Sequence, residues 1–305
     1  RRVGDGGDVE ILSRHRKIKR ARDSIDHGVD FISSLPDAIL QQHIFSLIPT
    51  KFAIRTSVLS KRWRHVWSET PSLSIDCYRS ESDPDSVNVT LGRHYSSPKI
   101  TSFHLSISCK AHRNIDSLIE FAMSRNTEKL SLELLLESAT IDTIPRLATV
   151  SWTSLKTLSL RFCVLSDESC AKILSGSPLL ECLTMYCGKL ERLDLSKSLR
   201  LKSLDVESWE PVMQIVAPHI HFLRLTHSDE SKCSLVDVTS LTEASLNIHC
   251  SKRLGFLIDD PETGLADSLQ AMILETLVKL HNVEKLTLSL QILSLSDVQG
   301  RSFDY

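Results

Sequence analysis

Several features of membrane, secreted and nucleic-acid-binding proteins are missing from this sequence. Its purely apolar runs are only a few residues long, as in Leu134–Leu136, and are far too short to span a bilayer as a helix. The first residues are polar and basic and lack the apolar core of a secretory signal. A formal net charge of -2 excludes strong attraction of the whole molecule to nucleic acid or anionic membranes.

The cysteines do not follow a metal-binding or disulfide pattern. None of the 8 cysteines forms a C-x-x-C pair, and no Cys/His group has zinc-finger spacing. Most of them lie inside apolar segments, where a free thiol behaves as a small hydrophobic group. We therefore interpret them as structural thiols in a reducing compartment, and expect neither a metal site nor a cofactor.

Recognised catalytic motifs are also missing. The chain has no H-E-x-x-H, no G-x-S-x-G, no P-loop and no G-x-G-x-x-G. With 12 histidines and 38 acidic residues, isolated catalytic-looking side chains are unavoidable. His219 and His221 could share one face of a strand, but surface histidines are the simpler interpretation. We predict no catalytic residues and no enzymatic activity.

Residues 1–29 are predicted to be a disordered basic tail, because they combine glycine, mixed charge and little periodicity. A cluster of six basic residues there contains no acid, although acidic residues flank it. It could be a nuclear import signal, a phosphate-binding arm or simply a solvated tail. A nuclear and/or cytoplasmic location is expected. The cluster comprises Arg14, Arg16, Lys17, Lys19, Arg20 and Arg22.

Residues 30–70 are predicted to form three short helices. Pro36 suits a first helical turn, and Leu40, Ile44, Leu47 and Ile48 then follow at the spacing of one apolar helical face, which Pro49 ends. The same spacing recurs at Leu59, Trp63, Val66 and Trp67, with basic residues between them. A hydrophobic core this small is only marginally stable alone, so the three helices need a neighbouring structure to pack against.

After a transition at 71–99, residues 100–295 carry an internal repeat, and 296–305 form a tail. The repeat is L-x-x-L-x-L, as in Leu155-Leu158-Leu160, with central positions about 20 to 28 residues apart. The L-x-L pair places two side chains on one face of a strand. Stacking such units produces a leucine-rich-repeat solenoid. The other central positions are residues 103, 130, 183, 204, 223 and 244.

The segments between the strands predict returning helices in some repeats. Ile115, Leu118, Ile119 and Ala122 mark one amphipathic helix, and Asp167 could cap another. The strand at Leu193 lies too close to its neighbours for helices, which predicts bare turns. The segment 255–270 is expected to be a loop before a helix at 272–280. The predicted fold class is α/β, a small N-terminal three-helix unit followed by an irregular leucine-rich-repeat solenoid.

The two halves together resemble a known family. Leu35-Pro36-Asp37, Ile48-Pro49-Thr50-Lys51 and Lys61-Arg62-Trp63 resemble an F-box, and the repeats resemble those of plant F-box/leucine-rich-repeat proteins. The FBD-associated F-box subgroup is the most similar, although we expect its C-terminal FBD region to be missing here. The resemblance implies a substrate-recognition subunit of an SCF-type (Skp–cullin–F-box) ubiquitin ligase, with catalysis in other subunits.

By the same resemblance, the F-box docks on a Skp-type adaptor, which links it to a cullin scaffold, and the repeats bind an unknown protein substrate. We expect no membrane partner and no nucleic acid. A repeat scaffold that acts without ligase assembly is the alternative. The resemblance assigns adaptor binding to Leu35, Pro36, Ile39, Leu40, Ile48, Pro49, Leu59 and Trp63. Outward positions next to the strand leucines make Arg161, Arg192, Asp194, Asp205 and Arg224 candidate substrate-binding residues.

One departure from the family pattern lies in the first predicted helix. Three residues, Gln41, Gln42 and His43, separate Leu40 from Ile44, where related sequences usually have two. An extra residue rotates the following side chains by about 100° on an α-helix. Either the helix absorbs it as a π-bulge or adaptor binding is weakened, in which case deleting Gln42 would tighten binding.

Overall fold

The computed structural model describes residues 31–77, 84–108, 115–135, 145–149, 151–188, 190–208, 212–228, 232–250 and 265–292. The chain divides into two compact units, residues 1–40 and 41–305. The predicted basic tail, including the cluster from Arg14 to Arg22, and the predicted tail at 296–305 lie outside the described residues.

In the first unit, two short helices are described, α2 (Phe31–Ser34) and α3 (Asp37–Ile39). Pro36 precedes α3 with φ -60°, and its carbonyl accepts hydrogen bonds from the backbone N–H of Ile39 (3.0 Å) and Leu40 (3.2 Å). Proline suits this position because no backbone donor is needed from the residue that begins a helix. The predicted helix start at Pro36 is therefore confirmed.

A π-helical turn spans Leu40–Ile44 and is followed by a 3₁₀ turn, Phe45–Leu47. The Ser46 hydroxyl donates to the Gln41 carbonyl, five residues earlier, at 2.7 Å, a separation typical of the widened turn. The extra residue is thus absorbed as a π-turn. The predicted continuous apolar face is wrong, because Phe45 is buried (1 % exposed) whereas Leu47 is 81 % exposed.

Two further short helices, α4 (Thr50–Arg55) and α5 (Trp63–Val66), are each extended by a 3₁₀ turn, at Thr56–Val58 and Trp67–Glu69. Pro49 precedes α4 as Pro36 precedes α3, so it begins a helix as well as ending the segment before it. The rings of Phe45 and Trp63 meet edge to face with centroids 5.4 Å apart, and Trp67 is buried as well.

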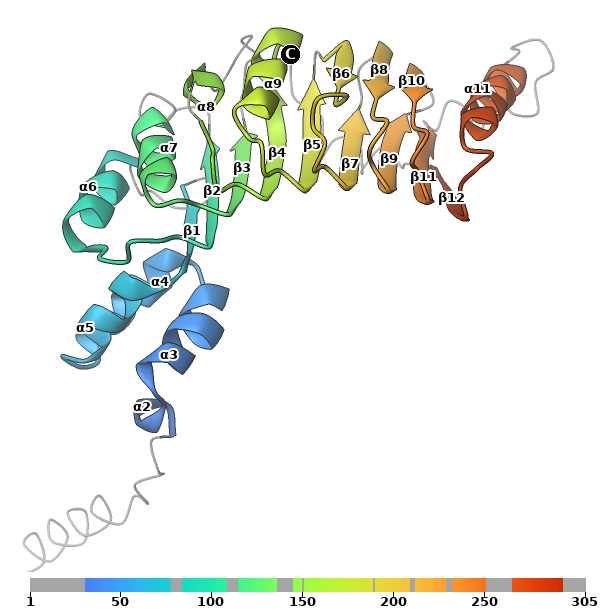
Figure 1. The fold of residues 1–305 in the computed structure, drawn as a ribbon. Helices are drawn as coiled ribbons and strands as arrows, with labels where there is room; N and C mark the ends of the chain where they lie inside the picture. Colours follow the sequence, from blue (N-terminus) through green and yellow to red (C-terminus); the bar gives the residue numbers. More distant parts are fainter. Residues whose placement is uncertain are drawn as a thin grey trace, which may run out of the picture. The chain divides into compact units, whose positions relative to one another are not determined.

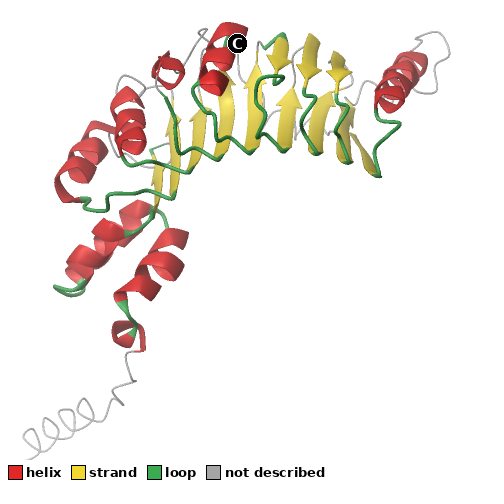
Figure 2. Ribbon diagram, in the orientation of Figure 1, coloured by secondary structure: helices red, strands yellow, loops and turns green. Residues whose placement is uncertain are grey.

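The second unit is built on a nine-stranded parallel sheet (Figures 1 and 2) with the order β1-β2-β3-β4-β5-β7-β9-β11-β12. The predicted repeat explains this sheet, since each L-x-L pair lies on one strand. The strands are β1 (Ser72–Asp76), β2 (Ser102–Ser108), β3 (Lys129–Leu135), β4 (Thr157–Val164), β5 (Cys182–Gly188), β7 (Ser203–Ser208), β9 (Phe222–Ser228), β11 (Glu243–Cys250) and β12 (Lys285–Ile292).

The central apolar position of every repeat is in register across the sheet. Leu130 pairs with Phe103 on one side and Leu158 on the other, and the same ladder continues strand by strand to Leu286. These side chains are buried from Leu73 through Ala244, which confirms the predicted solenoid core. Strand β1 was not predicted: its Leu73 joins the ladder from within the segment interpreted as a transition.

A second layer lies along one face of this sheet, and its composition changes along the chain. Helices occupy its first part: α6 (Pro84–His94), α7 (Ile115–Ser124), α8 (Pro145–Thr149) and α9 (Asp167–Ser175). Next to α9 begins a three-stranded parallel sheet of β6 (Arg192–Asp194), β8 (Val212–Val216) and β10 (Lys232–Asp237). Helix α11 (Leu265–Lys279) contacts β10 (Figure 1).

Several predictions about this layer need correction. The predicted strand at Leu193 is present as β6, but it does not lie between the strands of Leu183 and Leu204, because Leu193 pairs with Ile215 of β8 in the three-stranded sheet. Helix α9 is capped by the Ser166 hydroxyl, which accepts from the Ser169 N–H at 3.2 Å, so Asp167 is its first helical residue and not its cap. Helix α11 begins at Leu265, inside the predicted loop. The helix predicted around Leu118 is confirmed as α7.

Candidate protein-interaction surfaces

Exposed apolar side chains of the described residues gather in two segments of the chain. Fifteen large apolar side chains are exposed, of which seven lie in residues 31–59 and five in residues 274–290. Scattered exposed apolar residues are normal on protein surfaces, but clusters of them mark interaction sites. These two segments are therefore the first places to look for partners.

Four exposed side chains define the first surface within the second unit, here called the 47–59 patch. They are Leu47 (81 % exposed), Phe52 (51 %), Val58 (86 %) and Leu59 (68 %). They come from α4 and the turns on either side of it, while Ala53 of the same helix points into the core. The short helices thus bury one face and leave a second apolar face to solvent.

The segment that carries the 47–59 patch is basic. The segment from Leu47 to Arg64 contains five basic residues and no acidic residue. The Arg55 guanidinium lies 5.9 Å from the centre of the Phe52 ring, and Lys51, Lys61 and Arg64 are exposed. Exposed apolar and basic side chains in one segment suit a partner surface that combines apolar and acidic side chains.

The eight predicted adaptor-binding residues fall into three groups. Pro36, Ile39, Pro49 and Leu59 are exposed, and Leu35 and Ile48 are partly exposed. Leu40 (0 % exposed) and Trp63 (8 %) are buried, so assigning them to a surface needs correction. Trp63 packs on Phe45 within the helical core, and Trp67 is also buried. Leu47, Phe52 and Phe31 were not predicted, because no spacing rule separates them from core residues.

The helical segment is tied to the first strand of the solenoid by specific hydrogen bonds. The backbone N–H of Ser74, on the outer edge of β1, donates to the Thr50 hydroxyl at 2.9 Å. The Tyr95 hydroxyl donates to the Thr70 carbonyl at 2.6 Å, and burial raises the pKa of Tyr95 to about 12. The first edge of the nine-stranded sheet is thus the neighbouring structure that the small helical core needs for stability.

The five predicted substrate-binding residues do not share one surface. Arg161, Asp205 and Arg224 lie on β4, β7 and β9 of the nine-stranded sheet, and Arg224 forms an ion pair with Asp205 at 3.2 Å. Arg192 and Asp194 lie on β6, in the three-stranded sheet. Placing all five on one concave face was therefore wrong, because the strand at Leu193 belongs to the returning layer.

Asp194 has a structural role. Its carboxylate accepts from the Ser196 N–H at 3.0 Å, and Arg192 lies 3.4 Å away. Hydrogen bonds from Ser196, and then from Arg192, lower the pKa of this carboxyl below its ordinary value. A carboxylate that hydrogen-bonds the backbone two residues later stabilises a turn.

An aromatic pair on the nine-stranded sheet was not predicted. Phe162 has φ 56°, at the point where the register between β4 and β5 shifts, and its ring meets Tyr186 edge to face at 4.4 Å. Bulges redirect side chains, and positive φ is unfavourable for a bulky residue. The next residue, Cys163, is buried, as expected for a cysteine at this position of a leucine-rich repeat, and its thiol contacts the Arg161 carbonyl at 3.4 Å.

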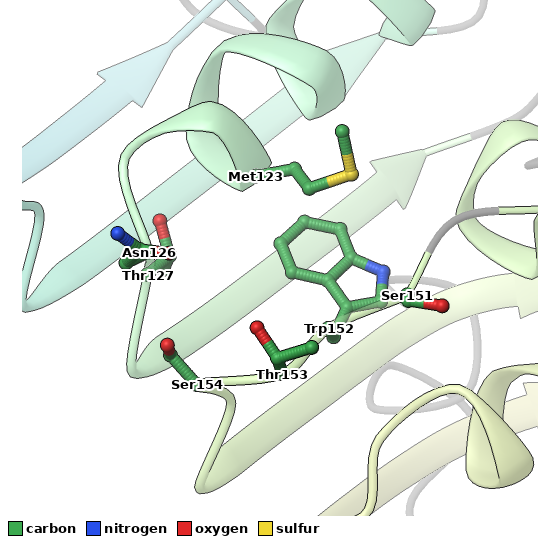
Figure 3. Close-up of a pocket in the computed structure, with 7 residues that line it drawn as sticks. All are labelled: Met123, Asn126, Thr127, Ser151, Trp152, Thr153 and Ser154. Carbon is green, nitrogen blue, oxygen red and sulfur yellow. The ribbon is translucent and has the colours of Figure 1, made fainter.

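A small cavity lies where the segment 151–154 passes the end of α7, with Met123 over the Trp152 ring (Figure 3). Its volume is about 10 Å³, enough for one water molecule, so it is no ligand site. Among the described residues, no group of His, Cys, Asp or Glu could hold a metal ion. Of the helices described, none is long and apolar enough to cross a membrane.

Comparison with known proteins agrees with this arrangement. Residues 32–74 match the F-box domain family, and residues 154–178 match the Leucine Rich Repeat family. Two relatives from Arabidopsis thaliana are F-box/LRR-repeat protein At5g02910, 52% identical over 92% of this chain and 65% of its own length, and F-box protein At5g03100, 48% identical over 90% and 94%. The chain therefore spans only about two thirds of the first of these relatives.

F-box/LRR-repeat protein At3g03360, also from Arabidopsis thaliana, is 46% identical over 90% of this chain and 62% of its own length. None of these three names mentions an FBD region, so that subgroup stays a prediction. The helical segment with its exposed patch and the strands with their leucine ladder coincide with the two matched families. This chain belongs to the plant F-box/leucine-rich-repeat proteins.

Proposed function

We propose that this chain is the substrate-recognition subunit of an SCF-type ubiquitin ligase and contributes no catalytic residue of its own. The observation that carries the proposal is the concentration of exposed apolar side chains in the F-box segment, including the 47–59 patch. An exposed apolar surface of this kind lowers the solubility of a domain. A partner that covers the surface permanently or frequently removes this disadvantage. In the F-box family that partner is a Skp-type adaptor.

In this proposal, the adaptor covers the 47–59 patch. The adaptor joins the chain to a cullin scaffold, and a protein substrate binds the repeats. The ligase then holds its substrate near the ubiquitin-loaded enzyme, so this chain contributes proximity and orientation. The basic cluster from Arg14 to Arg22 directs part of the protein to the nucleus.

Binding of purified full-length chain to a purified Skp-type adaptor tests this proposal. The variant Val58→Asp/Leu59→Asp places two carboxylates in the patch at positions that are 86 % and 68 % exposed, so the fold should tolerate them. We expect adaptor affinity to fall by at least about 100-fold, as is usual when central interface residues are replaced by charges. Leu199→Asp, at a 73 % exposed leucine outside the F-box segment, is the matched control and should bind as the original chain does.

Equal affinity of both variants and the original chain, or no adaptor binding at all, would contradict the proposal. The second outcome would favour the alternative, a repeat scaffold that binds partners without ligase assembly. Localisation of a fluorescent fusion, with and without alanine at Lys17, Lys19 and Arg20, tests the nuclear import signal; an unchanged distribution would contradict it.

A further inference from the structure

The loop between α6 and β2, residues 95–101, holds the end of the F-box segment against the repeats, and the structure describes all of it. The Ser68 carbonyl accepts hydrogen bonds from the backbone N–H groups of Ser96 (2.9 Å) and Ser97 (3.3 Å). The hydroxyls of Ser68 and Ser96 are also within hydrogen-bond distance, at 3.2 Å. A chemical change in this loop therefore acts directly on the junction between the two parts of the chain.

Ser97 is followed by Pro98, and a serine or threonine before proline is the dipeptide that proline-directed kinases modify. Three such dipeptides occur in the sequence, beginning at Thr70, Ser97 and Ser177. Thr70 (2 % exposed) and Ser177 (4 % exposed) are buried, whereas Ser97 is partly exposed and Pro98 is exposed. Of the three hydroxyl groups, the Ser97 hydroxyl is therefore the one that a kinase can reach.

Arg125 places a positive charge next to Ser97. Its guanidinium donates to the Ser97 carbonyl at 2.9 Å and lies 5.0 Å from the centre of the Tyr95 ring and 4.6 Å from that of Phe121. Within the described part of the chain, no carboxylate pairs with this guanidinium. The group has five N–H donors, so the two rings fix further donors beside Ser97 that the carbonyl does not use.

The sequence around Ser97 is basic as well. Residues 93–101 include Arg93, His94 and Lys99 and no acidic residue. A phosphate on serine carries about −1.5 to −2 charges at pH 7 and binds guanidinium groups through short, charge-assisted hydrogen bonds. Because a single residue carries both the carbonyl that Arg125 contacts and the hydroxyl, a phosphate on this hydroxyl would lie within reach of the guanidinium.

We propose that Ser97 is a phosphorylation site of a proline-directed kinase and that Arg125 binds the phosphate. The Ser97 oxygen attacks the γ-phosphorus of ATP, the bond from this phosphorus to the β,γ-bridging oxygen breaks, ADP leaves, and the hydroxyl proton passes to a carboxylate of the kinase. In the unmodified chain the Ser97 hydroxyl donates to the Lys99 carbonyl at 2.8 Å; Lys99 is exposed, so water replaces the lost donor. The bound phosphate then fastens the loop, and with it the contact to Ser68.

This inference goes beyond the proposed ligase role and does not depend on it. Its first test is incubation of the purified full chain with an active mitogen-activated protein kinase and Mg·ATP, followed by mass spectrometry of the peptides. We expect phosphate on Ser97 and none on the buried Thr70 and Ser177. Ser97→Ala should remove this phosphate, whereas Ser96→Ala, at the more exposed neighbouring serine, should be modified as the original chain is. An unmodified Ser97, or equal modification of Thr70 or Ser177, would overturn the proposal.

Hydrogen exchange of peptides that contain residues 68–71 and 95–101 tests the role of Arg125. Phosphorylation should slow their exchange by about 10-fold, the size expected for one charge-assisted hydrogen bond. In Arg125→Gln the phosphorylated and unphosphorylated chains should exchange equally, whereas Arg125→Lys should keep part of the effect because it keeps the charge. Comparison within each variant cancels the loss of the ring contacts. A full effect in Arg125→Gln, or unchanged or faster exchange after phosphorylation of the original chain, would overturn the assignment of Arg125.

Discussion

Replacing Phe45 by alanine is expected to destabilise the helical segment 41–70, whereas deleting Gln42 is expected to leave the segment and its adaptor binding unchanged. From the sequence alone, tighter adaptor binding after the deletion is one of two open outcomes, since the extra residue departs from the family pattern. In the structure, however, the π-helical turn Leu40–Ile44 directs Phe45 into the core. Removing one residue would restore an α-helical turn with Phe45 four positions after Leu40, which keeps the Phe45 ring on the same face and against Trp63.

The size of the effect follows from the contacts of Phe45. Its side chain is 1 % exposed, and its ring meets Trp63 edge to face at 5.4 Å. Returning a phenyl group to water costs about 1.5–3 kcal/mol, and loss of an aromatic pair costs about 0.5–1.5 kcal/mol more. Phe45→Ala should therefore destabilise this segment by about 2–4.5 kcal/mol, a large share of the stability of any small helical unit.

Hydrogen exchange measured by mass spectrometry suits this prediction, because it reports on each segment separately. Peptides from residues 41–70 should exchange about 30- to 2,000-fold faster in Phe45→Ala, whereas peptides from β4 and β5 should be unaffected. The Gln42 deletion, and Gln42→Ala at the same exposed position, should exchange as the original chain does. Unchanged protection in Phe45→Ala, or tighter adaptor binding after deletion of Gln42, would refute the reasoning.

Three further predictions concern buried or paired groups of the solenoid. Tyr95→Phe removes the hydrogen bond to the Thr70 carbonyl and should lower the free energy of unfolding by about 1–2 kcal/mol in urea titrations. Because the pKa of Tyr95 is about 12, the stabilisation by this hydroxyl should be complete below about pH 10 and disappear as the pH rises towards 12. Burial raises the pKa of the Cys170 and Cys233 thiols to about 12, so both should react with a thiol reagent only after unfolding, and rapid labelling of the native chain would contradict this. Hydrogen bonds from two lysines lower the pKa of Glu128, so Glu128→Gln should lower the free energy of unfolding by up to about 0.5 kcal/mol at pH 7. This difference in stability between variant and original chain should vanish as acid protonates the carboxylate, and a constant difference down to pH 2 would contradict the prediction.

The repeats were predictable because their signal is redundant. Each strand repeats the same apolar spacing, so an error at one strand leaves the register of the others intact, and every predicted central position from 103 to 244 is buried. The helical segment carries no such redundancy. There, a single π-turn buries Phe45 and exposes Leu47. The spacing of apolar residues assumes a regular α-helix, so it cannot reveal such a change of backbone geometry.

The candidate site was less predictable for a related reason. Exposure of Phe52 or Val58 depends on which face of a short helix is covered, which is decided by contacts distant in sequence. The same holds for Arg192 and Asp194, whose L-x-L context matches the repeat although their strand belongs to the other sheet. Nothing in the sequence around Phe162 marks its positive φ, which arises from the shifted register between β4 and β5.

The change from helices to strands in the second layer does have a signal in the sequence, namely repeat length. Central positions 103, 130, 158 and 183 are separated by 25 to 28 residues, and helices α7, α8 and α9 lie between those strands. Positions 183, 204, 223 and 244 are only 19 to 21 residues apart, and β6, β8 and β10 lie between their strands.

The physical reason is the rise per residue. A returning segment must travel back along the length of the strand that precedes it, and a helix of ten residues covers about 15 Å. A strand of five residues covers roughly the same distance. A repeat that is about six residues shorter can therefore close only if its return is extended. Repeat length thus decides whether a returning segment is a helix or a strand, and with it which outward side chains, such as Arg192, leave the nine-stranded sheet.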